Sequence, residues 1–225
     1  MVVEAVLIVL GVLLISFLFA PLGLGGGLLY APLFHYVGGW DIDQKLIIVS
    51  LLLSAITSYG SGLEHRKKGY HDDELTGIAL WGAIPGALIG VLFVFATQDQ
   101  FKSIFKLMSI IIVGFVIFKM VKRITATQSE NETESEIQVI KMTSLSAFGG
   151  FLSSVMAIGA GMIYVPAMKF FGVLNPRKAI GSSLNIMMVV VPFAIFAHFI
   201  LLETYQLESI KNEFLLLIGL VLTTF

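Results

Sequence analysis

Long apolar tracts separated by short polar stretches organise this chain. Most of its 14 Lys and Arg and 15 Asp and Glu side chains lie within residues 64–74, 119–141 and 203–213. The uncharged tracts are residues 5–40, 46–63, 75–98, 142–168 and 179–202. Because a helix needs about 20 apolar residues to cross a bilayer core, the tracts 46–63, 75–98 and 179–202 each predict one membrane-spanning helix. A further span is predicted over residues 101–123.

Composition supports the same interpretation. Of the 225 residues, 57% are apolar and 13% are charged, whereas a soluble domain carries about 25% charged residues. A soluble fold of this size would leave too much apolar surface in water, which excludes most classes of soluble enzyme. The alternating segments of about ten residues that build a membrane β-barrel are absent. The predicted fold class is therefore an all-α polytopic membrane protein.

Metals, cofactors and nucleic acid find little support in the sequence. The absence of cysteine excludes disulfides, thiol catalysis and cysteine-ligated metals. The net charge of −1 gives no reason to expect nucleic acid as a partner. The histidines and carboxylates of residues 64–74 fit no zinc or calcium spacing, and no nucleotide-binding fingerprint occurs. We predict no metal and no cofactor.

Two tracts are too long for one helix, and both contain glycine. As a single helix, residues 5–40 would be about 54 Å long, against a hydrocarbon core of about 30 Å. At a constant offset, Gly25, Gly27, Tyr30, Pro32 and Gly38 match Gly159, Gly161, Tyr164, Pro166 and Gly172. With one residue of slippage, Ser50 and His65 match Ser183 and His198. The match predicts a duplicated unit with a short, broken helix in each half.

The duplication divides the chain into three predicted parts. Residues 1–123 form the first transmembrane repeat, residues 124–138 a polar cytoplasmic linker, and residues 139–225 the second repeat. The second repeat stops part-way through the counterpart of 75–98, so we expect it to be incomplete, by truncation or by loss of two helices. No basic stretch precedes the first apolar run, and we expect that run to belong to the fold rather than to a signal peptide.

Charges in equivalent loops reverse their sign between the two halves. The basic run His65–Lys68 corresponds to a loop of the second half rich in Glu, and Asp41 and Asp43 correspond to Arg177 and Lys178. Since basic loops face the cytoplasm, the two halves are predicted to have inverted topology. The simplest solution has five segments in a full repeat, with the N-terminus outside and the linker inside. The alternative makes the short segments re-entrant hairpins and brings the N-terminus inside.

The glycine-rich breaks are the predicted substrate site. The short segments, about 28–38 and 162–172, would begin within the membrane, where irregular backbone is tolerated only inside protein or beside water. A helix start presents unpaired N–H groups and a positive dipole end, which glycine lets an anion approach. The glycines of this prediction are Gly25, Gly26, Gly27, Gly159 and Gly161. The alternative is close helix packing through small residues.

Hydroxyl and amide side chains near the breaks extend this prediction. Ser50, Ser54, Thr57, Ser58 and Ser61 share one side of a helix, where they could bind an oxyanion or line a polar path. Ser182, Ser183 and Asn185 are their nearest counterparts in the second half. The alternative is that these groups hydrogen-bond neighbouring helices together.

His35 and Lys169 occupy equivalent positions on the two short segments. Either side chain could offset the charge of a substrate, and His35 could carry a proton. The alternative is that both side chains reach to the membrane interface.

These residues resemble the TauE/SafE family of membrane permeases over essentially the whole chain. The resemblance is carried by the glycine run ending at Gly27 and followed by Pro32, by Gly159, Gly161 and Pro166, and by the stretch 179–183. Ala160 stands where the first motif has its middle glycine. The family motif maps onto Gly25, Gly26, Gly27 and Pro32, and onto Gly159, Gly161 and Pro166.

The resemblance implies a multi-pass transporter of the bacterial inner membrane that moves sulfite, sulfonates and related organic anions, often outward. A proton or another cation is then expected as the driving ion, and we expect alternating access around a central anion. A homo-oligomer is compatible with this interpretation. The alternatives are a passive anion channel and a membrane-embedded enzyme.

Overall fold

The fold consists of helices joined by loops, with no strand, in the part of the chain that the computed structural model describes, namely residues 2–19, 26–98, 100–111, 114 and 136–202. Its helices are α1 (Val2–Phe19), α2 (Gly27–Tyr36), α3 (Gln44–Lys67), α4 (Asp73–Ala96), α6 (Val139–Met156), α7 (Gly161–Pro166), the π-helical turn η1 (Ala167–Phe171) and α8 (Pro176–Ile200). Residues 101–111 are also helical, and the rest of the span predicted over 101–123 lies largely outside the described residues.

Four of these helices, α3, α4, α6 and α8, are long and apolar enough to cross a membrane. They contain the tracts predicted as spans at 46–63 and most of those at 75–98 and 179–202. Their outward faces remain apolar, as Trp81, Ile140 and Phe196 illustrate with exposed fractions of 83%, 82% and 65%. Such a surface is expected where lipid is the solvent. The prediction of an all-α polytopic membrane protein is confirmed.

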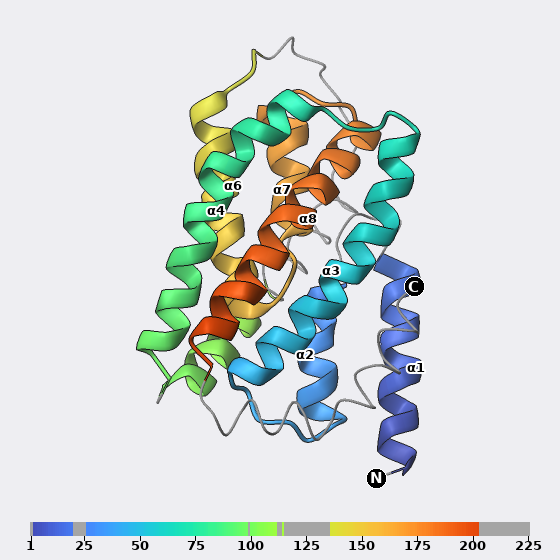
Figure 1. Cartoon of the computed structure of the whole chain (residues 1–225), viewed down its shortest axis with the longest axis vertical. Coiled ribbons are helices and arrows are strands. Elements are labelled where there is room, and N and C mark those ends of the chain that lie inside the picture. The colour runs from blue at the N-terminus through green and yellow to red at the C-terminus, as the bar shows by residue number, and fades with distance from the viewer. Residues whose placement is uncertain (1, 20–25, 99, 112–113, 115–135, 203–225) are drawn as a thin grey trace.

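The two long tracts bend back on themselves, as their glycines predict. In the first, Ile8 lies beside Gly38, and Leu33 lies beside Gly11, so α2 returns along α1 (Figure 1). In the second, the Gln138 N–H donates to the Phe171 carbonyl over 2.9 Å, so η1 ends where α6 begins. Each short helix therefore ends at the face of the molecule where its hairpin starts. This geometry matches the five-segment arrangement, in which α1 and α2 run in opposite directions, rather than the re-entrant alternative.

The equivalent helices α3 and α8 cross the centre of the molecule antiparallel (Figure 1). Gln44 at the start of α3 faces His198 near the end of α8, and the Tyr59 hydroxyl donates to the Met188 carbonyl over 2.8 Å. Two halves inserted in opposite senses require this opposed direction. The boundaries at 1–123, 124–138 and 139–225 stay predictions, and most of the linker lies outside the described residues.

Helix α4 of the first half packs in parallel on α6 of the second half through small residues. A Cβ atom at Gly82, Gly86 or Gly90 would overlap or crowd the carbonyl of Thr143, Ala147 or Phe151 respectively. Three glycines at a spacing of four residues let the two backbones touch along one face, as in other membrane helix pairs. This contact joins the two halves.

Three of the four membrane-spanning helices, α3, α4 and α8, begin with a side-chain cap, whereas α6 begins at Gln138 without one. Asp43, Asp72 and Asn175 accept hydrogen bonds of 3.0, 2.9 and 2.9 Å from the N–H groups three residues on. Helices α2 and α7 instead begin at Gly26 and Ala160 without a side-chain cap. The helices that begin at the two internal breaks therefore lack the polar caps found at the starts of α3, α4 and α8.

The α4–α6 contact predicts different outcomes for two glycines of the same helix. Gly86→Ala must push the helices apart, and we expect it to lower the free energy of unfolding by about 1–3 kcal/mol. Gly77 is exposed with no atom near a built Cβ, so Gly77→Ala should be neutral or slightly stabilising. Thermal unfolding of both variants in detergent measures this. Equal stability of the two variants would contradict the packing.

Candidate functional site

The two chain breaks meet beside the middle of α3. A Cβ atom at Gly27 would overlap the carbonyl oxygen of Ala157 and lie 2.5 Å from the Ser54 Oγ. Ala157 directly precedes the break of the second half, so the first turn of α2, the end of α6 and the Ser54 hydroxyl share one place. We call this place the glycine corner, defined by Gly26, Gly27, Ser54 and residues 157–161. These residues are buried.

The corner has the same backbone shape in both halves although the residues differ. Gly26, directly before α2, has φ of 69°, and its counterpart Ala160, directly before α7, has φ of 53°. A left-handed conformation costs a residue with a Cβ atom roughly 1–2 kcal/mol. The second half therefore keeps the turn without the glycine that would make it strain-free, and the packing around Ala160 must hold it.

A chain of hydroxyls lies next to the corner in the first half. The Tyr30 hydroxyl is 2.8 Å from the Ser16 Oγ and 3.0 Å from the Thr57 Oγ1. Ser16 and Thr57 also donate to the carbonyls of Val12 and Leu53. A built Cβ at Gly26 would be 2.7 Å from the Tyr30 hydroxyl, so only glycine leaves room for this cluster.

The second half carries the equivalent tyrosine without its partners. Tyr164 is fully buried, and its hydroxyl makes no hydrogen bond. The positions equivalent to Ser16 and Thr57 are occupied by Gly150 and Val190, which offer no side-chain oxygen. A buried polar group left unpaired costs about 1–3 kcal/mol. The two halves are therefore alike in shape but different in polarity.

Other buried polar atoms also lack a protein partner. The hydroxyl of Ser50, one turn from Ser54 along α3, makes no hydrogen bond, and neither amide atom of Asn185 does. Such groups are rare in folded proteins and are typical of places where a ligand or water completes the bonding. Ser50 and Asn185 were both predicted from the sequence as binding residues.

The remaining predicted residues lie in different places. Ser54 lies at the corner, and Thr57 belongs to the Tyr30 cluster. Ser182 accepts a 2.9 Å bond from the Asp72 N–H, and Ser183 donates to the Ile180 carbonyl over 2.8 Å, so both bind backbone near the start of α8. Pro32 and Pro166 lie inside α2 and α7 and are partly buried. Gly159 and Gly161 are buried at the corner, whereas Gly25 lies outside the described residues.

His35 and Lys169 are not brought to the corner. The His35 Nδ1 lies 2.7 Å from the Trp40 carbonyl oxygen at the far end of α2. Lys169 lies in η1 with its ammonium 5.5 Å from the ring centre of Phe170. Each is about eight residues beyond the helix start, or about 12 Å along an α-helix. This placement favours the interface over direct contact with a ligand at the corner.

One end of the α3–α8 pair is closed by buried polar side chains. The His198 ring is fully buried, and its Nε2–H donates to the Ser154 carbonyl over 2.9 Å. Its Nδ1 then accepts from the Gln44 amide at 3.5 Å. The repeat pairs His198 with His65, but it did not indicate the contact with Gln44, because that contact joins opposite ends of the chain.

Tyr30, Ser16 and Tyr164 were not named as site residues, although Tyr30 and Tyr164 belong to the repeated motif. Their repetition at equivalent positions was the feature of the sequence that could have identified them as site residues. No group of three or more His, Asp or Glu side chains among the described residues could hold a metal ion.

The sequence of this chain is similar to those of known proteins. The model of the family "Sulfite exporter TauE/SafE" matches residues 7–225. Two relatives, from Xylella fastidiosa strains Temecula1 and 9a5c, are each named "Probable membrane transporter protein" and are 26% identical over 178 residues. The matched region covers 76% of this chain and 65% of either relative, so this chain spans less than two thirds of their length. No solved structure matches.

The left-handed turn at Ala160 predicts a stabilising substitution. Ala160→Gly removes the penalty of the Cβ atom, and we expect the free energy of unfolding to rise by about 1 kcal/mol. Ala167→Gly, inside the helical region, is the control and should destabilise by about 0.5–1 kcal/mol. Thermal unfolding in detergent distinguishes them. A loss of stability in Ala160→Gly would show that the turn carries no strain.

The two equivalent tyrosines predict opposite effects of the same change. Tyr30→Phe deletes a hydroxyl with two partners and should cost about 1–2 kcal/mol of folding free energy. Tyr164→Phe deletes an unpaired buried hydroxyl and should leave stability unchanged or raise it. Parallel denaturation of both variants is the measurement. An equal loss in both would mean that Tyr164 has a partner.

Proposed function

We propose that this chain, which belongs to the TauE/SafE sulfite exporter family, is a secondary transporter of small organic or sulfur-containing anions such as sulfite or sulfonates. It would act in the plasma membrane, export its substrate, and use a proton or another cation as the driving ion. The names of the family and of the relatives support transport as the general activity.

The observation that carries the proposal is the meeting of the two chain breaks, from which α2 and α7 begin, at the glycine corner. Neither α2 nor α7 has a side-chain cap, and both begin at buried residues. The third N–H of each helix donates to the carbonyl of Gly26 or Ala160, so we propose that the first two N–H groups of each helix bind the anion. Backbone N–H groups at a helix start bind anions well because the helix dipole adds to the hydrogen bonds. Inverted repeats bring two such starts to one depth.

Neutral hydrogen-bond donors complete the proposed site. Ser54 lies at the corner, and its hydroxyl, which donates to the Ser50 carbonyl here, would turn to donate to the anion. The unpaired groups of Ser50, Tyr164 and Asn185 are close in sequence to Ser54 or to its counterpart. A buried anion needs hydrogen bonds in place of its water shell. An oxyanion with several acceptor oxygens suits a site that offers hydroxyl, amide and backbone donors without a fixed cation.

The α3–α8 pair supports alternating access as the mechanism. The two helices are equivalent and antiparallel, so a small rotation between the halves would open one end while closing the other. In the structure, Gln44, His198 and the Ser154 carbonyl close one end. We propose that these contacts separate when the transporter opens to that side.

Flux of radiolabelled sulfite into proteoliposomes tests the activity. Accumulation against its gradient when a pH or cation gradient is imposed supports a secondary transporter. Flux that only follows the sulfite gradient indicates a channel, and chemical conversion of sulfite indicates an enzyme. Absence of flux with every anion of the class, in protein shown to be folded, would overturn the proposal.

Ser54 predicts a specific loss of transport. Its hydroxyl donates to the Ser50 carbonyl, a bond whose removal costs the helix little, but it also lies at the corner. Ser54→Ala should reduce the initial rate about tenfold or more through the loss of one bond to a charged ligand.

Ser109→Ala is the matched control, because Ser109 donates in the same way to the Phe105 carbonyl on residues 101–111. It should transport at the unaltered rate. Equal rates for Ser54→Ala and the unaltered protein would remove the corner from the proposed site.

A further inference from the structure

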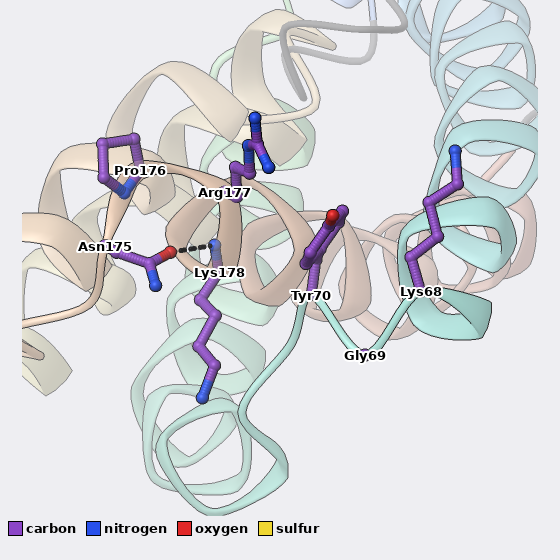
Figure 2. Close-up of a pocket in the computed structure, with 7 residues that line it drawn as sticks. All are labelled: Lys68, Gly69, Tyr70, Asn175, Pro176, Arg177 and Lys178. Atoms are coloured by element: carbon purple, nitrogen blue, oxygen red, sulfur yellow. Dashed lines mark hydrogen bonds between the residues drawn. The ribbon is translucent and has the colours of Figure 1, made fainter.

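A cavity of about 520 Å³ lies away from the glycine corner, between the α3–α4 turn and the start of α8 (Figure 2). Lys68 and Tyr70 line it from the turn, and Asn175, Arg177 and Lys178 line it from α8. Since α3 ends and α8 begins here, and both helices are long enough to span, the cavity lies at the surface of the membrane. Its size is in the range of pockets that bind small ligands, about 300–1,000 Å³.

The cavity is lined by cations and by no carboxylate. Figure 2 shows Arg177 beside Tyr70, with its guanidinium 5.8 Å from the ring centre, while Lys178 and Lys68 lie to either side of that ring. Among the described residues, Arg177 and Lys178 have no acidic partner within ion-pair distance. Lys68 is different, because it forms a 3.0 Å pair with Glu64.

The acidic side chains near this cavity are already engaged elsewhere. Asp73 lies 3.9 Å from Arg66 and 3.5 Å from His71. Asp72 accepts the 2.9 Å bond from the Leu75 N–H that caps α4. The positive charge of Arg177 and Lys178 is thus not balanced from the side of the α3–α4 turn, and an anion from outside the protein would meet little competition.

The fold itself does not require these cations. Asn175 already caps α8 by accepting from the Lys178 N–H, so the helix start does not depend on the Arg177 side chain. At the opposite end of the α3–α8 pair, Gln44 is buried against His198. The pair is therefore closed by neutral side chains at one end and lined by cations at the other.

The geometry points to a second anion site: we propose that this cavity binds an oxyanion group, a phosphate, sulfate or sulfonate, between Arg177 and Lys178 with Tyr70 as its apolar wall. Guanidinium and ammonium groups bind such oxygens through charge-assisted hydrogen bonds. A three-oxygen group alone would not fill 520 Å³, so the cavity has room for an organic part. The group can belong to a dissolved anion or to the headgroup of an anionic lipid. The site is independent of transport, because binding needs only the cavity and its cations.

The test is equilibrium binding to the full chain in lipid nanodiscs, with a double variant that neutralises the cavity. In the first arm, sulfate is titrated by calorimetry into discs of phosphatidylcholine at constant ionic strength. In the second, thermal unfolding is compared between discs with and without phosphatidylglycerol, since a ligand of the folded state raises Tm. The variant is Arg177→Gln with Lys178→Gln.

The control removes the same charge at the same end of the molecule. It is Lys141→Gln with Lys169→Gln, whose ammonium groups lie over Phe171 and Phe170 outside the cavity. In the first arm, we expect the cavity variant to bind sulfate with an affinity at least tenfold lower. In the second arm, we expect it to lose the rise in Tm that phosphatidylglycerol produces in the unaltered protein. The control should change by less than twofold.

The outcomes separate this proposal from the proposed transport site. Sulfate binding lost only in the cavity variant assigns a dissolved anion, and an effect only in the lipid arm assigns a headgroup. Absence of both effects, or an equal loss in the cavity variant and the control, overturns the site. Sulfate binding that is lost in Ser54→Ala but kept in the cavity variant would place the anion at the glycine corner and overturn the site as well.

Discussion

The contact between Gly27 and the Ala157 carbonyl is the constraint on which this fold depends. Inside a bilayer, a helix break exposes backbone groups that lipid cannot satisfy, so it is tolerated only where protein surrounds it. Here each half covers the break of the other: the start of α2 lies against the end of α6, with the Ser54 hydroxyl of α3 beside them. A side chain at Gly27 would separate the two breaks and expose both.

Glycine also decides how the halves are joined. The parallel pair of α4 and α6 depends on three glycines that let one backbone touch the next, and dispersion forces over that short distance take the place of the hydrophobic effect, which is weak between helices in lipid. The central pair of α3 and α8 is different, because it is antiparallel and carries polar contacts near one end and in its middle. The halves are thus held together by close backbone packing at the periphery and by polar contacts at the centre.

The two halves share their backbone but have diverged in polarity. The Tyr30 hydroxyl lies within hydrogen-bond distance of two other hydroxyls, while the Tyr164 hydroxyl has no partner, and Gly150 and Val190 occupy the positions equivalent to Ser16 and Thr57. Gln44 near the start of α3 is buried, whereas Arg177 near the start of α8 is exposed beside a cavity. A duplicated fold requires only that the backbone shape be preserved. The side chains of the two halves can therefore differ in polarity, and both proposed binding sites contain such differences.

The sequence by itself determined the spans at 46–63, 75–98 and 179–202, the two internal breaks, and the helical pattern shared by the two halves. These features follow from distances along the chain: bilayer thickness sets the length of an apolar tract, and glycine shows where a longer tract must bend. The hairpins at Gly27 and Gly161 and the antiparallel course of α3 and α8 agree with those expectations. Ser54 and Thr57 are buried on α3, and their role in binding stays a prediction.

Only the tertiary structure decided which polar groups are paired. Ser182 and Asn185 are close in sequence and look alike as candidates, yet Ser182 binds the Asp72 N–H while Asn185 has no partner. The contact of Gln44 with His198 and the cavity at Arg177 likewise join residues far apart in the chain. Hydrogen bonding and charge balance depend on which surfaces meet when the halves pack, and no local pattern encodes that meeting.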